Sequence, residues 1–268
     1  MRARGRAEGR RAARLWVVLP VAATCACAAP RPHGDWTPLF NGTDLAGWIP
    51  KLRGHELGED PYGTFRVEDG LLTVRYEGYD TFADRFGHLF YESPFSRYEL
   101  RVEYRFVGEQ AAGGADWAFK NSGVMFHAQS PRSMLPGQDF PISLEAQLLG
   151  GNGVDARSTA NLCTPGTHVE IDGALVERHC TDSTSPTYHG EEWVTLDLLV
   201  LGDSLIAHVI GGDTVLAYAR PVIGGGVVNG HDPAAKRDGE RLTGGYIALQ
   251  SESHPIQFRR VLIRQIPR

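Results

Sequence analysis

The sequence has no apolar run long enough to span a membrane. A transmembrane helix needs about 20 consecutive apolar residues, the run at Leu15–Ala23 is much shorter, and no later stretch qualifies. An apolar period of 3.6 residues also never persists for more than a turn or two, which excludes a helical fold. The GxGxxG, GxSxG and HExxH patterns are missing, so the sequence gives no support for a dinucleotide fold, a serine-hydrolase elbow or a zincin site.

Positive charge is scarce outside the N-terminal segment. Six of the 27 basic residues and one of the 32 acidic residues lie in residues 1–29, which leaves 21 basic and 31 acidic residues in the rest of the chain. A net charge near -10 disfavours binding to a phosphate backbone. We therefore expect no nucleic-acid partner.

The N-terminal segment has the order of a secretory signal. Six arginines come first, the apolar run Leu15–Ala23 follows, and small residues lead to Ala29. This order predicts a signal peptide over residues 1–29 and export to the periplasm or the cell exterior. Two alternatives stay open: a lipoprotein signal with a lipid anchor at Cys25 or Cys27, and a disordered basic N-terminus.

Cysteine is equally scarce, since only Cys163 and Cys180 remain after the leader, with sixteen residues between them. In an exported protein such a pair predicts a disulfide. A metal site is the weaker reading because no close CxxC pair is present. The chain after the leader shows no linker and no internal repeat, so we expect a single domain over residues 30–268.

What the sequence does contain is many short alternating runs. Residues 98–106 alternate strictly between charged side chains and apolar or aromatic ones, which predicts a strand. Residues 64–74 predict a hairpin around Asp69-Gly70. Residues 191–221 predict a three-stranded meander, and residues 244–266 predict two strands. These patterns predict an all-β fold, a two-sheet antiparallel sandwich of the jelly-roll type.

Polar residues interrupt two of these apolar strands. In residues 121–127, one face carries Asn121 and His127 together with Gly123 and Met125, and in residues 144–150 Glu145 and Gln147 share a face. Polar groups inside a strand are costly unless they meet a partner or a ligand. We therefore expect a site on a concave sheet face, and a satisfied structural network is the alternative.

A second cluster lies between the two cysteines. His168, Glu170 and Asp172 alternate there and would share a face in an extended chain. A histidine with carboxylates is a donor set for a divalent metal. The alternative is the polar outer face of a hairpin pinned by the disulfide.

Several segments together carry a resemblance to a known family. They are LFNGTDLAGW, NSGVMFH, LEAQLLGG, EEWVTLDLLV and GYIALQ followed by PIQFRRV, in this order. The chain resembles the 3-keto-disaccharide hydrolase domain family, which has a concanavalin A-like lectin/glucanase fold. The family's Phe-Arg-Asn triplet is Phe258-Arg259-Arg260 here, a departure from the pattern.

This resemblance implies a substrate, namely a glycoside already oxidised to a ketone at C3 by a separate dehydrogenase. It implies Glu145 or His127 as the base, with the four side chains of Asn121, Gln147, Gln250 and Arg259 binding substrate. A divalent metal held by His168 and Glu170 is the one candidate cofactor. Two other functions stay open: a lectin-like module that binds sugars without catalysis, and a glucanase, which the single carboxylate of the Glu-x-Gln strand disfavours.

Overall fold

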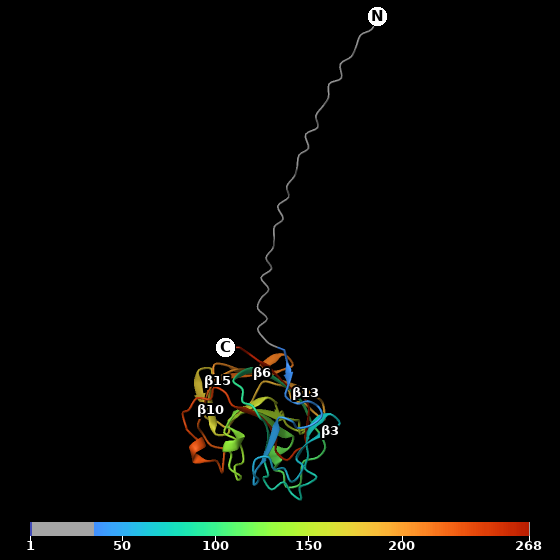
Figure 1. The fold of residues 1–268 in the computed structure, drawn as a ribbon, viewed down its shortest axis with the longest axis vertical. Helices are drawn as coiled ribbons and strands as arrows, with labels where there is room; N and C mark the ends of the chain where they lie inside the picture. Colours follow the sequence, from blue (N-terminus) through green and yellow to red (C-terminus); the bar gives the residue numbers. More distant parts are fainter. Residues whose placement is uncertain (2–34, 268) are drawn as a thin grey trace. The chain divides into compact units, whose positions relative to one another are not determined.

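The computed structural model of the chain describes Met1 and residues 35–267, and the regular secondary structure of this part is almost entirely β. Two antiparallel sheets contain all the strands, and the only helices described are three single 3₁₀ turns, η1 (Asp116–Ala118), η2 (Pro131–Ser133) and η3 (Pro233–Ala235) (Figure 1). The predicted all-β, two-sheet antiparallel fold is confirmed.

The larger sheet has ten strands in the order β11-β10-β15-β14-β13-β6-β17-β4-β3, with β1 paired to β17. Their bounds are β1 Thr37–Pro38, β3 Phe65–Glu68, β4 Leu71–Val74, β6 Arg97–Phe106, β10 Thr167–Ile171, β11 Ala174–Val176, β13 Val194–Leu201, β14 Ile206–Ile210, β15 Asp213–Ile223 and β17 Ile256–Gln265.

The smaller sheet has seven strands in the order β12-β9-β8-β7-β16-β5-β2. Their bounds are β2 Trp48–Leu52, β5 Gly87–Tyr91, β7 Asn121–Ala128, β8 Leu144–Leu149, β9 Asn161–Cys163, β12 Cys180–Thr181 and β16 Tyr246–Ser251. Neighbours in this sheet are far apart in sequence, since β16 pairs with both β7 and β5.

Alternation along the strands builds the main core between the sheets. From β6 the residues Leu100 and Val102 are buried in it, from β13 Leu196 and Leu198, and from β7 Val124, while every second residue points away. Burying these side chains contributes roughly 1.5–3 kcal/mol each relative to leaving them exposed. The predicted hairpin, meander and two C-terminal strands are all present.

Each sheet has a second face, turned away from this core. On the larger sheet it carries a ladder of paired charges, which we call the charged face: Arg101 binds Asp197 with Nε to Oδ1 at 2.7 Å, and the rings of Trp36 and Trp193 lie against arginine side chains. On the smaller sheet this second face carries Asn121, Glu145 and Gln147, and we call it the site face.

Four strands of the smaller sheet were not predicted. The strands β2, β5, β9 and β12 have only five, five, three and two residues. Such short runs show too few alternating positions for a pattern to be recognised. The predicted leader with Cys25 and Cys27 lies outside the described residues, and the domain limits 30–268 remain a prediction. No described helix has the length and apolar character needed to cross a membrane.

Candidate active site

The centre of the site face is a glycine covered by a carboxyl group. Gly123 of β7 pairs with Gln147 of β8, and Met125 pairs with Glu145. A Cβ atom on Gly123 would lie 2.4 Å from Oε1 and 2.7 Å from Cγ of Glu145. The side chain of Glu145 therefore lies across the backbone of β7, in a position that only a glycine leaves open.

A row of polar side chains crosses the sheet at the level of this glycine. On one side Gln147 pairs with Asn161 of β9. On the other, Gln250 of β16 follows Leu249, which pairs with Val124, so Gln250 lies level with Gly123 and pairs with His88 of β5. The strand order thus assembles residues from four distant segments of the chain on one face.

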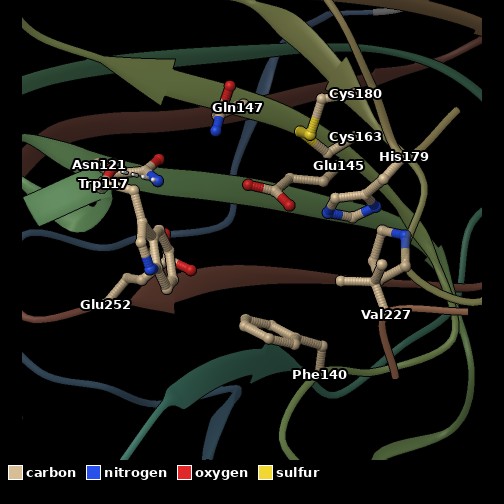
Figure 2. Close-up of a pocket in the computed structure, with 11 residues that line it drawn as sticks. Trp117, Asn121, Phe140, Glu145, Gln147, Cys163, His179, Cys180, Val227 and Glu252 are labelled. Carbon is tan, nitrogen blue, oxygen red and sulfur yellow. Dashed lines mark hydrogen bonds between the residues drawn. A yellow bond between two sulfur atoms is a disulfide. The ribbon is translucent and has the colours of Figure 1, made fainter. Parts of the chain in front are cut away.

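A cavity of about 270 Å³ lies over the β7–β9 part of this row. Its lining is Trp117, Asn121, Phe140, Glu145, Gln147, Cys163, Pro165, His179, Cys180, Val227 and Glu252. Figure 2 shows the carboxyl group of Glu145 in the middle of this lining, with Gln147 on one side and the ring of Phe140 on the other. The cavity combines apolar walls with a few converging polar groups, as small-molecule sites do.

Two carboxyl groups line the cavity, and both are hard to ionise. Burial raises the pKa of Glu145 to about 8. Burial, together with the charge of Glu145, raises the pKa of Glu252 well above its usual value. Because like charges in a buried site resist joint ionisation, the pair retains at least one proton at neutral pH.

Several polar atoms around the pair have no partner within the described protein. They include Oδ1 of Asn121 and Oε1 of Gln250, both buried. Nε2 of Gln250 lies 3.4 Å from Oε1 of Glu252, and Oε1 of Gln147 accepts from Asn161 at 3.1 Å. Buried polar groups are nearly always hydrogen-bonded, so these free acceptors indicate a place for water or for a polar ligand.

The predicted disulfide is present and forms part of the cavity wall. Cys163 and Cys180 are joined with a Cα–Cα distance of 4.1 Å, and strands β9 and β12 pair at the same two residues. His179 precedes Cys180 and lines the cavity. Burial lowers the pKa of His179, so its imidazole is neutral at pH 7. The two sulfur atoms and His179 lie close enough for a metal, but sulfurs joined in a disulfide supply no thiolate ligand.

The alternation predicted that His127 shares a face with Asn121 and Glu145. In the structure it does not. Its φ of +48° interrupts β7, and the register with β16 shifts at the same place. Nε2 of His127 lies 3.0 Å from the carbonyl oxygen of Gly202, in the turn between β13 and β14. This positive φ turns the imidazole away from the cavity, so we do not retain His127 as a candidate base.

Arg259 also lies elsewhere. It belongs to β17 of the larger sheet, where its Nε donates to Oε2 of Glu103 at 2.5 Å and its guanidinium lies 4.6 Å from the ring centre of Trp193. Arg259 is therefore part of the charged face, and we do not retain it among the substrate-binding residues.

His168 and Glu170 do not form the expected metal site. A β-bulge separates them in the pairing of β10 with β15, Glu170 binds Arg220 at 2.7 Å, and His168 packs against Gly224. Within residues 35–267, the one cluster of three potential ligands contains neither residue. This arrangement of His168 and Glu170 does not fit a metal, so neither residue is retained as a ligand.

Six lining residues were not predicted as site residues: Trp117, Phe140, Pro165, His179, Val227 and Glu252. Trp117 lies in η1, Phe140 in the loop before β8, and Glu252 directly after β16. Alternation of polar and apolar residues identified Glu145 because it lies in a strand. Loop residues show no such alternation, so this pattern could not identify them. A sequence signal does exist for Glu252, which continues the alternation begun by Gln250.

Comparison with known proteins agrees with this fold. The family model described as the 3-keto-alpha-glucoside-1,2-lyase-like domain matches residues 35–264. No functionally curated protein matches the chain in sequence.

Two solved structures of candidate glycosyl hydrolases from Parabacteroides distasonis ATCC 8503 are similar in fold. The first has a TM-score of 0.51 at 17% identity and covers 87% of this chain and 100% of its own chain. The second has a TM-score of 0.50 at 17% identity and covers 87% and 94%. At this identity the likeness supports the fold, the concanavalin A-like sandwich, and nothing further about the reaction.

Proposed function

The chain belongs to the family of 3-keto-alpha-glucoside-1,2-lyase-like domains, and from this premise we propose that it cleaves 3-keto-glycosides, including 3-keto-disaccharides, at the glycosidic bond. A ketone at C3 acidifies the proton on C2. Loss of that proton breaks the C2–H bond, and its electron pair forms a C2=C3 bond while the ketone oxygen becomes an enolate. When the ketone re-forms, the pair moves into the C1=C2 bond and the C1–O bond breaks to release the leaving group, which takes up a proton. Addition of water to the product then gives net hydrolysis.

The observation that carries this proposal is the environment of Glu145. Its carboxyl group lies buried over Gly123, in a cavity whose walls are largely apolar, and no hydrogen bond from any described residue is directed at it. Burial raises its pKa to about 8. A more basic carboxylate is a better acceptor for a carbon-bound proton, and a pKa near the working pH is what general base catalysis favours. We assign Glu145 as the base.

The other groups of the cavity fit the remaining charges of this reaction. Glu252 holds its proton more firmly than an ordinary glutamate, so it is the acid that protonates the departing oxygen. The amides of Asn121, Gln147 and Gln250 bind hydroxyl groups of the sugar. The neutral imidazole of His179 donates to the enolate oxygen that develops at C3.

The proposed reaction also bears on how the substrate is supplied and in which compartment the protein acts. A 3-keto-glycoside must be supplied by a dehydrogenase that oxidises C3, which we take to be a separate protein. The Cys163–Cys180 disulfide supports action in an oxidising compartment, in line with the predicted leader over residues 1–29. We propose that the protein is exported to the periplasm or the cell exterior, with a lipid anchor at Cys25 or Cys27 as the alternative to release.

A conventional glycosidase is the second candidate, and Glu252 is the observation that favours it. The structure supplies a second carboxyl group that the Glu-x-Gln pattern lacked, and glycosidases work with two carboxyl groups. An ionised Glu145 beside a protonated Glu252 serves either reaction, so the raised pKa values do not separate the two, and the family match favours the 3-keto-glycoside. A module that only binds sugar needs neither carboxyl group.

Turnover of a 3-keto-glucoside beside its unoxidised parent separates these functions. We expect the purified protein to release the leaving group from the keto form only, and to do so equally well after treatment with a chelator. Release from the parent at a comparable rate would contradict the proposal and support a glycosidase. Saturable binding of both sugars without release from either would identify a lectin-like module.

A further inference from the structure

One wall of the cavity holds three metal-ligating side chains in one place. The sulfur atoms of Cys163 and Cys180 and a ring nitrogen of His179 all lie within 4.8 Å of one another. Figure 2 shows the disulfide and the ring of His179 near the side chain of Glu145. Two cysteines and a histidine form a ligand set of zinc sites, with a fourth position left to water or another group. What separates this cluster from such a site is the bond between the two sulfur atoms.

The cluster is held together by more than the disulfide. Cys163 and Cys180 are partners in the backbone pairing of β9 with β12. The backbone N–H of Thr164 donates to the carbonyl oxygen of His179 at 2.8 Å, and the hydroxyl group of Thr164 donates to the same oxygen at 3.1 Å. None of these bonds involves sulfur. They therefore keep the three ligands close to one another when the disulfide is open.

A carboxyl group without a partner adjoins the cluster. Glu145 of β8 pairs with Cys163 across the sheet, so the two side chains lie on the same face. Glu145 is 5% exposed, and no described residue directs a hydrogen bond at its carboxyl group. This group leans toward Gly123 and lies outside the three-ligand cluster. A carboxylate oxygen is nevertheless a ligand that Zn²⁺ accepts, so either Glu145 or a water molecule in the cavity can complete the coordination.

We propose that reduction of the Cys163–Cys180 disulfide turns this wall into a binding site for Zn²⁺, and that the bound ion closes the active site. The two thiolates and His179 are the protein ligands. The ion occupies one end of the cavity and engages His179, which the proposed mechanism uses at the enolate oxygen. The metal site rests on its own geometry, and only its effect on turnover rests on the proposed function.

A dithiol supplies the electrons for this change. Cys163 is buried and Cys180 reaches the surface, so a thiolate of the dithiol attacks Sγ of Cys180. The S–S bond breaks and releases the thiolate of Cys163. The second thiol of the reductant then displaces Cys180, which leaves the reductant oxidised to a disulfide and both cysteines reduced. Zn²⁺ replaces the two thiol protons, which pass to solvent.

Titration with Co²⁺ tests the site, because Co²⁺ substitutes for Zn²⁺ and its thiolate complexes have a charge-transfer absorption. The protein is reduced with a water-soluble phosphine, freed of reductant, checked by circular dichroism and titrated without air. Cys163→Ser removes one thiolate, and His179→Gln removes the imidazole while keeping both thiols. His189→Gln is the matched control, since His189 is an exposed histidine that follows β12 and does not line the cavity.

We expect the reduced wild type to bind one Co²⁺ per chain with a thiolate band, and the oxidised wild type to show no such band. Zn²⁺ should remove the band by displacing Co²⁺, since thiolate ligands select zinc. His179→Gln should weaken binding by about tenfold or more, at least the loss caused by removing an outer-shell partner. Cys163→Ser should lose most of the band, and His189→Gln should match wild type.

A reduced wild type without a thiolate band would overturn the site, and so would equal Co²⁺ affinity in wild type and His179→Gln. Loss of the folded circular dichroism spectrum on reduction would also overturn it, because the unfolded chain has no cavity wall.

Turnover of the 3-keto-glucoside by the reduced protein tests the effect on the active site. One equivalent of Zn²⁺ should abolish turnover, and a chelator should restore it. Unchanged turnover with Zn²⁺ bound would overturn the closing of the active site while the proposed function stands. Absence of turnover in the oxidised, metal-free protein would contradict the proposed function, and Co²⁺ binding would still decide the metal site.

Discussion

The two outward faces of the sandwich carry similar residue types and differ in how these are satisfied. On the charged face, Glu103 is buried but receives hydrogen bonds from both Arg259 and Arg260. On the site face, Glu145 is equally buried and faces no cation that hydrogen-bonds to it among the described residues. A buried carboxylate with partners stabilises a fold, whereas one without partners is maintained at a cost in stability, and such a cost indicates function.

The strongest test of this contrast exchanges each glutamate for glutamine. Glu145→Gln keeps the shape and removes the base, so we expect turnover of the 3-keto substrate to fall by about 10³-fold. Glu103→Gln should retain most of the activity and lose stability, because its arginine partners lose an anion. Kinetics and thermal unfolding of both variants measure this, and comparable activity in the two would contradict the contrast.

The difference in stability between wild type and Glu145→Gln should depend on pH in a defined direction. A carboxyl group with a raised pKa stabilises the fold fully below its unfolded pKa of about 4.5, and this contribution is lost as pH rises through about 8. The variant should therefore unfold at a higher temperature than wild type at pH 9.

A smaller loss of activity is expected when the carboxyl group of Glu145 is kept but displaced. In Gly123→Ala the new Cβ would lie 2.4 Å from Oε1 of Glu145, so the side chain must move. A displacement of about 1 Å costs about 10²-fold in rate. Gly137→Ala, where a Cβ meets nothing within 4 Å, is the matched control, and wild-type kinetics in Gly123→Ala would show that the position of Glu145 is unimportant.

The contribution of Glu252 as the general acid should depend on how strongly the leaving group needs a proton. With a sugar leaving group, Glu252→Gln should lower kcat by about 10²-fold, whereas with p-nitrophenolate, which departs without a proton, the change should be only a few-fold. Steady-state rates on the two substrates give this ratio. Equal losses on both would mean that Glu252 does not protonate the leaving group.

The smallest effect on activity is expected from a substitution on the charged face. Arg259→Ala should lower the free energy of unfolding by about 1 kcal/mol, since its ion pair with Glu103 is partly exposed, and it should change kcat/KM by less than about twofold. A tenfold loss of activity at unchanged stability would return Arg259 to the substrate site.

Much of the fold could be predicted because strands of the larger sheet such as β6 and β13 alternate between buried and more exposed positions. Strand β6 alternates over ten residues, and the meander and the C-terminal strands show the same period. The fold family was predicted from segments such as NSGVMFH and LEAQLLGG, which become β7 and β8.

The site could be predicted only where it follows such alternation. Alternation placed Asn121, Glu145 and Gln147 on strand faces, and all three line the cavity, whereas Trp117 and His179 lie outside regular strands. His127 was misplaced because a residue with positive φ reverses the direction of the side chain. Arg259 was misplaced because its partner Glu103 is 156 residues away, and a pairing across that distance becomes visible only in the fold.

The most direct measurement is exchange of the C2 proton of a 3-keto-glucoside with D₂O, followed by NMR across pH in wild type and Glu145→Gln. We predict that wild-type exchange rises by about tenfold per pH unit and levels off near the pKa of Glu145, about 8, while the variant shows only background exchange. Exchange by Glu145→Gln at the wild-type rate, or a flat wild-type profile between pH 6 and 8, would contradict the assignment of Glu145 as the base.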